Sequence, residues 1–120
     1  MNAPPPKDLF IRTKSFAIDT FKLCNGIPKN PTNWTISDQL RRSSSSVAAN
    51  FRASKRAKSS KDYSYKINVV EEEADESLFW LELLSEFNQE KKIEIELLMK
   101  EANELTAIFT SIGRNLKNKL

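Results

Sequence analysis

The sequence predicts an all-α protein that folds as an antiparallel, up-down-up-down four-helix bundle. Its 120 residues fit one ordinary domain with a single core. Only two glycines and five prolines occur, so long stretches contain no helix breaker. Apolar residues recur at alternating spacings of three and four, which is typical of helices that pack in a bundle. No segment shows the alternation that predicts a strand.

The first helix is predicted to begin after Asp8, a suitable N-cap, and to end near Asn25, because Gly26 follows as a stop signal. Residues 1–8 are then expected to form a flexible N-terminal tail. Residues 9–120 form the four-helix bundle domain in this interpretation.

The second helix is expected to begin around residues 32–35 and to end near Ala57. The serine run 43–46 is a weak helix former, so tertiary packing must hold it. A third helix capped by Ser60 has the seam Tyr63, Ile67, Val70, Ala74, Ser77, Leu81 and Leu84. After a polar turn at residues 88–90, a fourth has the seam Ile95, Leu98, Ala102, Leu105, Phe109, Ile112 and Leu116. Long helices with short connections lie antiparallel.

The composition argues against an enzyme, and we expect no catalytic residue, cofactor or metal. The sequence has no histidine, which removes the commonest general base and the commonest metal ligand. Cys24 is the only cysteine, and its spacing from Ala17 and Phe21 predicts a core thiol. In the acidic third helix, Val70 and Ala74 rather than the carboxylates lie on the seam, so a metal centre between helices is not expected.

The N-terminal segment lacks the apolar core of a signal peptide, and no apolar run approaches the roughly 20 residues that span a bilayer. We therefore expect a cytoplasmic protein with no membrane partner.

Charge is distributed unevenly, although the net charge is only +3. Residues 1–62 carry twelve Lys/Arg and four Asp/Glu, a net charge of +8, whereas residues 63–120 carry seven and twelve, a net charge of −5. The first half includes a basic stretch without an intervening acid, formed by Arg41, Arg42, Arg52, Lys55, Arg56, Lys58 and Lys61.

Two interpretations of this basic stretch are open, and both can hold for different residues. Because successive helical residues turn by about 100°, one stripe of the second helix carries Arg41, Ser45, Ala48, Arg52, Lys55 and Arg56. This stripe could bind the phosphates of RNA or DNA, with salt-sensitive affinity. Alternatively, the stretch is a solvated face that pairs with the acids of the third helix, Glu73 or Glu76 holding Arg41 or Arg42.

Two further groups of residues have expected structural roles. Ser43, Ser46 and Asn50 lie near the core side of the second helix, so their polar groups need partners; a polar layer with Glu73 would supply them and fix the helix register. Phe79 and Leu83 point away from the seam of the third helix. Such an outward apolar pair predicts a contact between subunits.

Five segments of the chain, in this order and spacing, carry a resemblance to a known family. They are residues 39–43 (QLRRS), 46–53 (SVAANFRA), 56–59 (RAKS), 72–77 (EEADES) and 80–84 (WLELL). Together they resemble the bacterial four-helix-bundle family named for the 23S rRNA intervening sequence.

The resemblance covers about residues 9–112. It implies a four-helix bundle, an assembly that is often pentameric, and an association with RNA or other nucleic acid, but no catalytic residue. A related bundle is a basic pentameric accessory factor of diversity-generating retroelements, from which this chain differs in its acidic second half. We therefore expect a non-enzymatic homo-oligomer, a homopentamer by resemblance, that binds RNA or DNA through the basic stretch. The alternative is a protein-protein interaction scaffold or accessory subunit that binds no nucleic acid.

Overall fold

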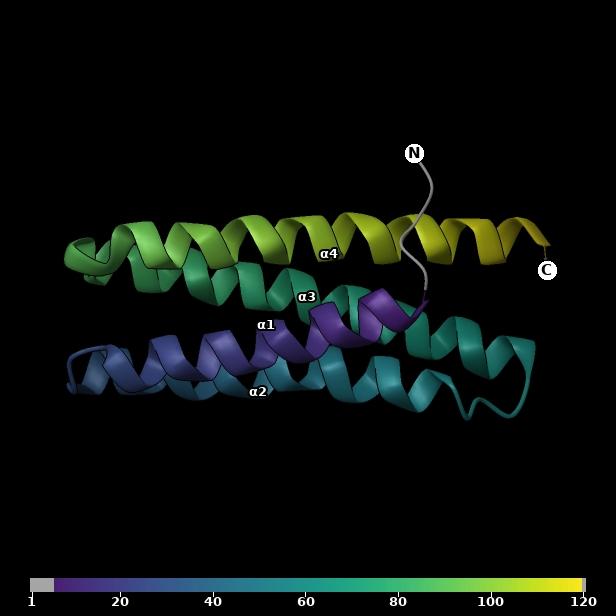
Figure 1. Ribbon diagram of the computed structural model, residues 1–120, viewed down its shortest axis with the longest axis horizontal. Coiled ribbons are helices and arrows are strands. Elements are labelled where there is room, and N and C mark those ends of the chain that lie inside the picture. Colours follow the sequence, from purple (N-terminus) through teal and green to yellow (C-terminus); the bar gives the residue numbers. More distant parts are fainter. Residues whose placement is uncertain (1–5, 120) are drawn as a thin grey trace.

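The protein consists of four long α-helices that lie side by side (Figure 1). The structure is a computed structural model that describes residues 6–119. The elements are α1 (Pro6–Gly26), α2 (Pro31–Ser54), α3 (Ser60–Phe87), the short 3₁₀ helix η1 (Gln89–Lys91) and α4 (Lys92–Lys119). Consecutive helices run in opposite directions, as the order of colours in Figure 1 shows. The predicted all-α, antiparallel four-helix bundle is confirmed.

The start of α1 differs from the prediction. The helix begins at Pro6, because a proline is well tolerated in a first helical turn, where its missing N–H is not needed. Asp8 therefore lies in the first turn, where its negative charge faces the positive end of the helix dipole. Of the expected tail, residues 1–5 lie outside the described residues.

The ends of α2 and α3 are set by local hydrogen bonds. Asn30 caps α2, its side chain accepting a hydrogen bond of 2.8 Å from the backbone N–H of Asn33. The helix ends at Ser54 instead of near Ala57. The residue that caps α3 is Ser59 instead of Ser60, and its hydroxyl oxygen accepts a bond of 3.0 Å from the backbone N–H of Asp62.

The core runs along the axis of the bundle, on the seams that the spacing predicted. All four helices contribute fully enclosed side chains, among them Phe16, Leu40, Val47, Ile67, Leu81, Leu105 and Phe109. Ser43 and Ser44 of the serine run are also buried, and their hydroxyls donate to the carbonyls of Leu40 and Arg41 in the turn before. These bonds satisfy the hydroxyls inside the core, so packing can hold a segment of low helix propensity.

The bundle turns the charge asymmetry of the sequence into two layers of opposite charge. The first, α1 and α2, belongs to the half of the chain with a net charge of +8, and the second, α3 and α4, comes almost entirely from the half with −5. We call them the basic and the acidic layer; they are the lower and upper halves of Figure 1. None of the helices within residues 6–119 is apolar over enough of its length to cross a membrane.

Candidate functional site

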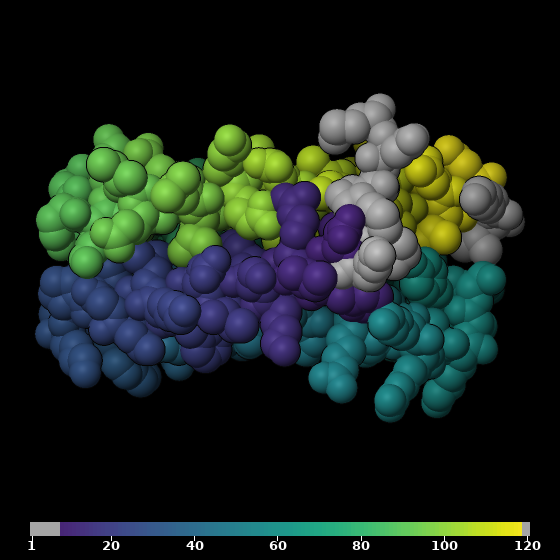
Figure 2. Space-filling view, in the orientation of Figure 1, coloured from purple at the N-terminus to yellow at the C-terminus, as the bar shows by residue number. Residues whose placement is uncertain are grey.

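Five of the predicted nucleic-acid-binding residues lie in one short segment where α2 gives way to α3. We call residues 52–61 the basic segment. Its cations are Arg52, Lys55, Arg56, Lys58 and Lys61, and it contains no acid. All five are exposed. Figure 2 shows the side chains of this teal part of the chain projecting from the body of the molecule at lower right.

The backbone of the basic segment is held in a defined conformation. The N–H groups of Lys55 and Arg56 donate to the carbonyls three residues earlier, at 3.2 and 3.0 Å, which tightens the last turn of α2. Across the connection, Asp62 accepts hydrogen bonds from the ammonium of Lys66 at 2.8 Å and the backbone N–H of Lys58 at 2.9 Å. The bond from Lys66 and then that from Lys58 lower the pKa of Asp62.

The positive charges of the basic segment are largely uncompensated. Among the side chains that the structure describes, none of its five cations has an ion-pair partner. Lys55 instead places its ammonium 3.8 Å from the centre of the Phe10 ring, a cation-π contact that orients the group without neutralising it. A group of like charges whose side chains have no ion-pair partner attracts a polyanion.

A cleft of about 590 Å³ opens beside the basic segment, against α4. Lys55 and Lys58 contribute to its lining, and so do the polar groups of Ser59, Ser60 and Tyr63. Among the described residues, no carboxylate side chain lines it. Ammonium and hydroxyl groups are donors that phosphate oxygens accept from, so the chemistry of this cleft suits a phosphate group.

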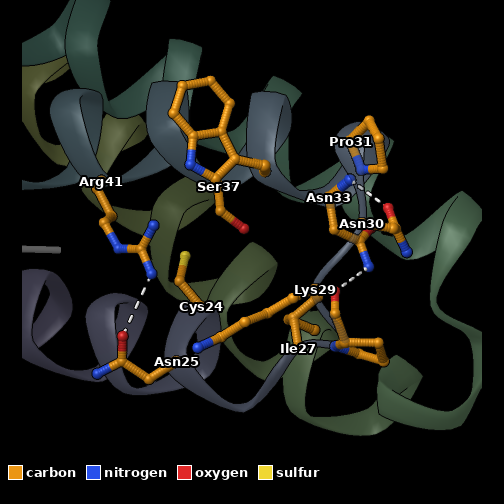
Figure 3. Close-up of a pocket in the computed structure, with 11 residues that line it drawn as sticks. Cys24, Asn25, Ile27, Lys29, Asn30, Pro31, Asn33, Ser37 and Arg41 are labelled. Carbon is orange, nitrogen blue, oxygen red and sulfur yellow. Dashed lines mark hydrogen bonds between the residues drawn. The ribbon is translucent and has the colours of Figure 1, made fainter.

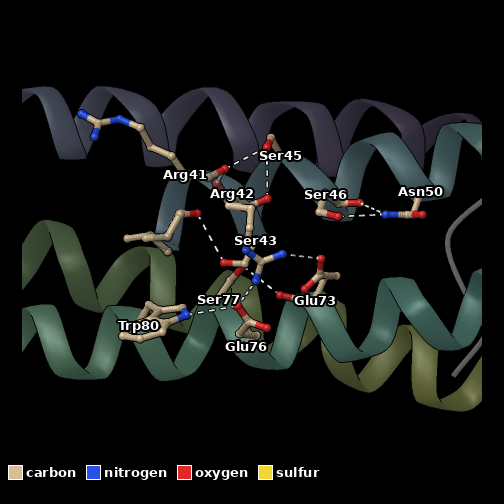
Figure 4. Close-up of polar contacts among 12 residues, drawn as sticks. Arg41, Arg42, Ser43, Ser45, Ser46, Asn50, Glu73, Glu76, Ser77 and Trp80 are labelled. Atoms are coloured by element: carbon tan, nitrogen blue, oxygen red, sulfur yellow. Dashed lines mark hydrogen bonds and ion pairs between the residues drawn. The ribbon is translucent and has the colours of Figure 1, made fainter. Parts of the chain in front are cut away.

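The neighbouring arginines Arg41 and Arg42 differ in their electrostatic surroundings (Figure 4). Arg42 forms ion pairs with Glu73, at 3.0 Å, and with Glu76, on the facing helix α3. Trp80 also donates to Glu76, at 3.2 Å. Arg41 donates to the neutral side-chain oxygen of Asn25, at 3.2 Å, and has no ion-pair partner among the described side chains. Pairing with the acids of α3 therefore applies to Arg42. The guanidinium of Arg41 is available to bind an anionic ligand.

The four residues of the expected polar layer do not form one group. The hydroxyl of Ser43 lies 2.9 Å from that of Ser77, a residue predicted on the seam without a polar role, and the Ser77 hydroxyl also lies 2.9 Å from the backbone carbonyl oxygen of Glu73. Ser46 instead accepts a hydrogen bond from the Asn50 amide at 2.9 Å, and Glu73 turns to Arg42. The layer divides because seven residues, about 10 Å along the helix axis, separate Ser43 from Asn50.

The predicted subunit contact lies on the outer face of α3. Phe79 is 52% exposed and Leu83 is half-buried. Phe87, which was not among the predicted contact residues, is 60% exposed and continues the same face at a spacing of four residues. We call Phe79, Leu83 and Phe87 the α3 apolar stripe.

Cys24 and the carboxylates of α3 were considered in the sequence as possible reactive or metal-binding groups. The Cys24 side chain is buried, and its burial raises the pKa of the thiol, although Ser37 and Arg41 act in the opposite direction. Glu71 accepts a hydrogen bond of 2.6 Å from Thr110 of α4. Within the described part of the chain, the cysteine and the carboxylates form no group of three that could hold a metal ion.

Comparison with known proteins places the chain in a family. A solved structure of similar fold is that of a protein of unknown function from the S23 ribosomal protein family of Bacteroides thetaiotaomicron. The two chains are 26% identical, with a TM-score of 0.82 over 91% of this chain and 97% of the other. A search of curated proteins found no match. The model of the 23S rRNA-intervening sequence protein family matches residues 8–111. Because the match covers most of the chain, the protein belongs to the 23S rRNA-intervening sequence protein family.

Proposed function

We propose that this protein is a non-enzymatic helical bundle that binds RNA or DNA through the basic segment. The observation that supports this most directly is the group of five exposed cations that have no ion-pair partner among the described side chains. Each phosphate that such a group neutralises releases bound counterions, which favours binding at low salt. The adjacent cleft offers further donors to a phosphate backbone.

We further propose that copies of the chain associate, as a homopentamer by family resemblance, through the α3 apolar stripe. The two phenylalanines and Leu83 would bury apolar surface that water otherwise covers. The stripe lies on the acidic layer, so an assembly built through it leaves the basic segments free. Several weak sites in one particle would then bind a polymer with greater avidity than one site alone.

The test is binding of a structured ribosomal RNA fragment and a matched duplex DNA across a salt series. The variant Arg52→Glu/Lys55→Glu/Arg56→Glu should lose binding while it remains folded by circular dichroism. For the wild type, the logarithm of the binding constant should fall steeply with the logarithm of the salt concentration, with a slope of about 0.9 for each phosphate neutralised on duplex DNA. Such a slope would support the proposal. Unchanged affinity in the variant would refute the assignment of this site.

The matched control is Lys22→Glu/Lys92→Glu/Lys100→Glu, which changes the net charge by the same amount. These three lysines are exposed and lie outside the basic segment. The control should bind nearly as well as the wild type. If both variants lost binding equally, the interaction would depend on net charge alone, and the assignment of binding to the basic segment would be wrong.

The second candidate function is a protein-protein interaction scaffold, which the α3 apolar stripe favours. It predicts that the basic variant shifts the melting temperature or the oligomeric state without any effect on nucleic acid, and that no RNA or DNA binds even at low salt. Light scattering on the purified protein measures the mass. A monomer at all concentrations would refute self-association in either function.

A further inference from the structure

Two clefts lie between α1 and α2, on the side of the molecule away from α4. The first, of about 590 Å³, lies beside the connection between the two helices (Figure 3). Nearer the other end lies a second cleft of about 450 Å³. Arg41 of α2 lines the first cleft, and Ser45, one helical turn later, lines the second. We call the two together the α1–α2 groove.

The lining of this groove carries positive charge only. Lys29 and Arg41 line the first cleft, and Lys14, Arg52 and Lys55 line the second. No carboxylate lines either one. Two clefts lined by α4 residues away from the basic segment differ. Glu71, Glu72 and Asp75 outnumber Lys117 in the lining of one, and Asp19 and Glu94 outnumber Lys22 in the lining of the other. The α1–α2 groove therefore matches a polyanion, and these two clefts do not.

The polar groups of the first cleft are held in place. Asn25 fixes the guanidinium of Arg41, and the side chain of Lys29 runs back toward Asn25 and Cys24 (Figure 3). Arg41 thus has three properties that suit a phosphate: no ion-pair partner among the described side chains, partial burial, and a hydrogen bond that orients it.

Exposed aromatic rings accompany these cations. Trp34 is 67% exposed and lines the first cleft. Phe21, 38% exposed, lies one helical turn from both Ala17 and Asn25, so it belongs to the face of α1 that borders the groove. Between the cations of α2, Ser45, Ala48 and Ala49 present only small side chains, which leaves room for a ligand to approach closely. A basic groove with aromatic faces is the arrangement that binds single-stranded nucleic acid.

We propose that the α1–α2 groove binds a single strand of nucleic acid, with a base stacked on Trp34 and the phosphates on Arg41, Arg52 and Lys55. The inference rests on the proposed function and deepens it, because a duplex cannot offer an unstacked base to Trp34. Lys55 directly follows the last residue of α2 and is 21 residues from Trp34, which corresponds to about 32 Å along the helix axis. A stacked nucleotide spans about 3.4 Å and an unstacked one spans more, so the groove accommodates at most about nine nucleotides.

The experiment uses the intrinsic fluorescence of the full-length protein. The chain has two tryptophans, so the variant Trp80→Phe reports on Trp34 alone. Oligouridylates and oligothymidylates of about 3, 9 and 15 nucleotides are titrated at low salt. We expect quenching of Trp34 and an affinity that rises steeply up to about nine nucleotides and then levels off. If Trp80→Phe is unstable, the difference in emission between the wild type and Trp34→Phe supplies the same signal.

Affinity measurements by anisotropy with a labelled strand test the role of the ring. Trp34→Ala should weaken binding by about 5- to 150-fold, the range for one base stacked on an aromatic side chain. The control is Leu97→Ala, since Leu97 is 66% exposed but lies on α4 in the acidic layer, away from the basic segment. The control should not change the affinity.

The outcomes separate this inference from the proposed function. If Trp34 is not quenched and Trp34→Ala binds normally, while Arg52→Glu/Lys55→Glu/Arg56→Glu still loses binding, the groove is wrong and the basic segment stands. If neither single strands nor duplexes bind, both proposals fail. An acidic peptide that quenches Trp34 as strongly as the oligonucleotides do would also overturn the groove, because its partner would then be a protein segment.

Discussion

Two buried asparagines, 55 residues apart in the sequence, join the start of α2 to the end of α3. The amide of Asn33 donates to the side-chain oxygen of Asn88 at 2.9 Å, and the amide of Asn88 donates back at 2.8 Å. Each amide also donates to a backbone carbonyl, Asn33 to Pro28 and Asn88 to Leu84, both at 2.9 Å. Both side chains are almost completely enclosed. This pair should therefore be a major determinant of stability at its end of the bundle.

The magnitude follows from the hydrogen bonds. Asn33→Ala or Asn88→Ala each removes three of the four bonds. At about 1 kcal/mol for each bond, either substitution should lower the free energy of unfolding by about 3 kcal/mol. The double variant removes all four bonds and should cost about 4 kcal/mol rather than the about 6 kcal/mol expected from independent sites. The coupling energy is then about 2 kcal/mol.

Thermal unfolding followed by circular dichroism measures the effect. For a chain of 120 residues the entropy of unfolding is about 0.25 kcal/mol/K, so 3 kcal/mol corresponds to a decrease in Tm of about 12 °C. Urea unfolding of the two single variants and the double variant completes the double-mutant cycle. Additive effects, or single variants within about 0.5 kcal/mol of the wild type, would refute the reasoning.

Three further predictions concern buried or paired groups. The Thr20 hydroxyl is buried and has no hydrogen-bond partner among the described residues, so Thr20→Val should raise the free energy of unfolding by about 1 kcal/mol and Tm by about 4 °C; a lower Tm would contradict this. Burial raises the pKa of the Cys24 thiol, so iodoacetamide should modify native protein at neutral pH much more slowly than protein in denaturant; equal rates would place the thiol at the surface. The hydrogen bond from Lys66 lowers the pKa of Asp62 below its ordinary value of 3.8. Asp62 therefore contributes stability above that pH and loses it as the pH falls through the folded-state pKa. The difference in urea midpoint between wild type and Asp62→Asn should shrink below pH 3.8, whereas a constant difference would argue against the ionic contribution.

The seams of the helices could be predicted because they depend on local spacing. Ile67, Leu81 and Leu105 are fully enclosed, as a period of three and four residues requires of a helix that faces a core. The predicted positions of the helix ends were less accurate, since they depend on which single residue caps the helix. The pair Asn30-Pro31 could have indicated the start of α2, because asparagine is a favoured N-cap and proline a favoured first residue of a helix.

Partners across helices could not be predicted from periodicity. The pattern placed Ser43 near the core but did not indicate that Ser77 would face it. In the same way, Asn88 looked like an ordinary turn residue, although it is enclosed against Asn33. Such pairs depend on how far one helix is shifted along its neighbour, and a one-dimensional pattern does not contain that shift. Trp34 and Lys29 were missed for this reason too, because only the packing of α1 on α2 forms the cleft that they line.

The distribution of ion pairs explains how one molecule combines a stable bundle with free positive charge. Arg12 of α1 bonds to Glu101 of α4 with an Nε–O distance of 3.0 Å, and Arg42 of α2 pairs with two glutamates of α3. These contacts join the basic layer to the acidic layer. Arg41 is adjacent to Arg42 in sequence, but the turn of about 100° directs it toward α1, where the described lining offers no carboxylate. A shift of one residue along the helix thus separates an arginine that is ion-paired within the fold from one whose charge is available to a ligand. Substitutions at the two positions should therefore affect different properties: Arg42→Gln should chiefly lower stability, and Arg41→Gln should chiefly weaken binding of the nucleic-acid strand.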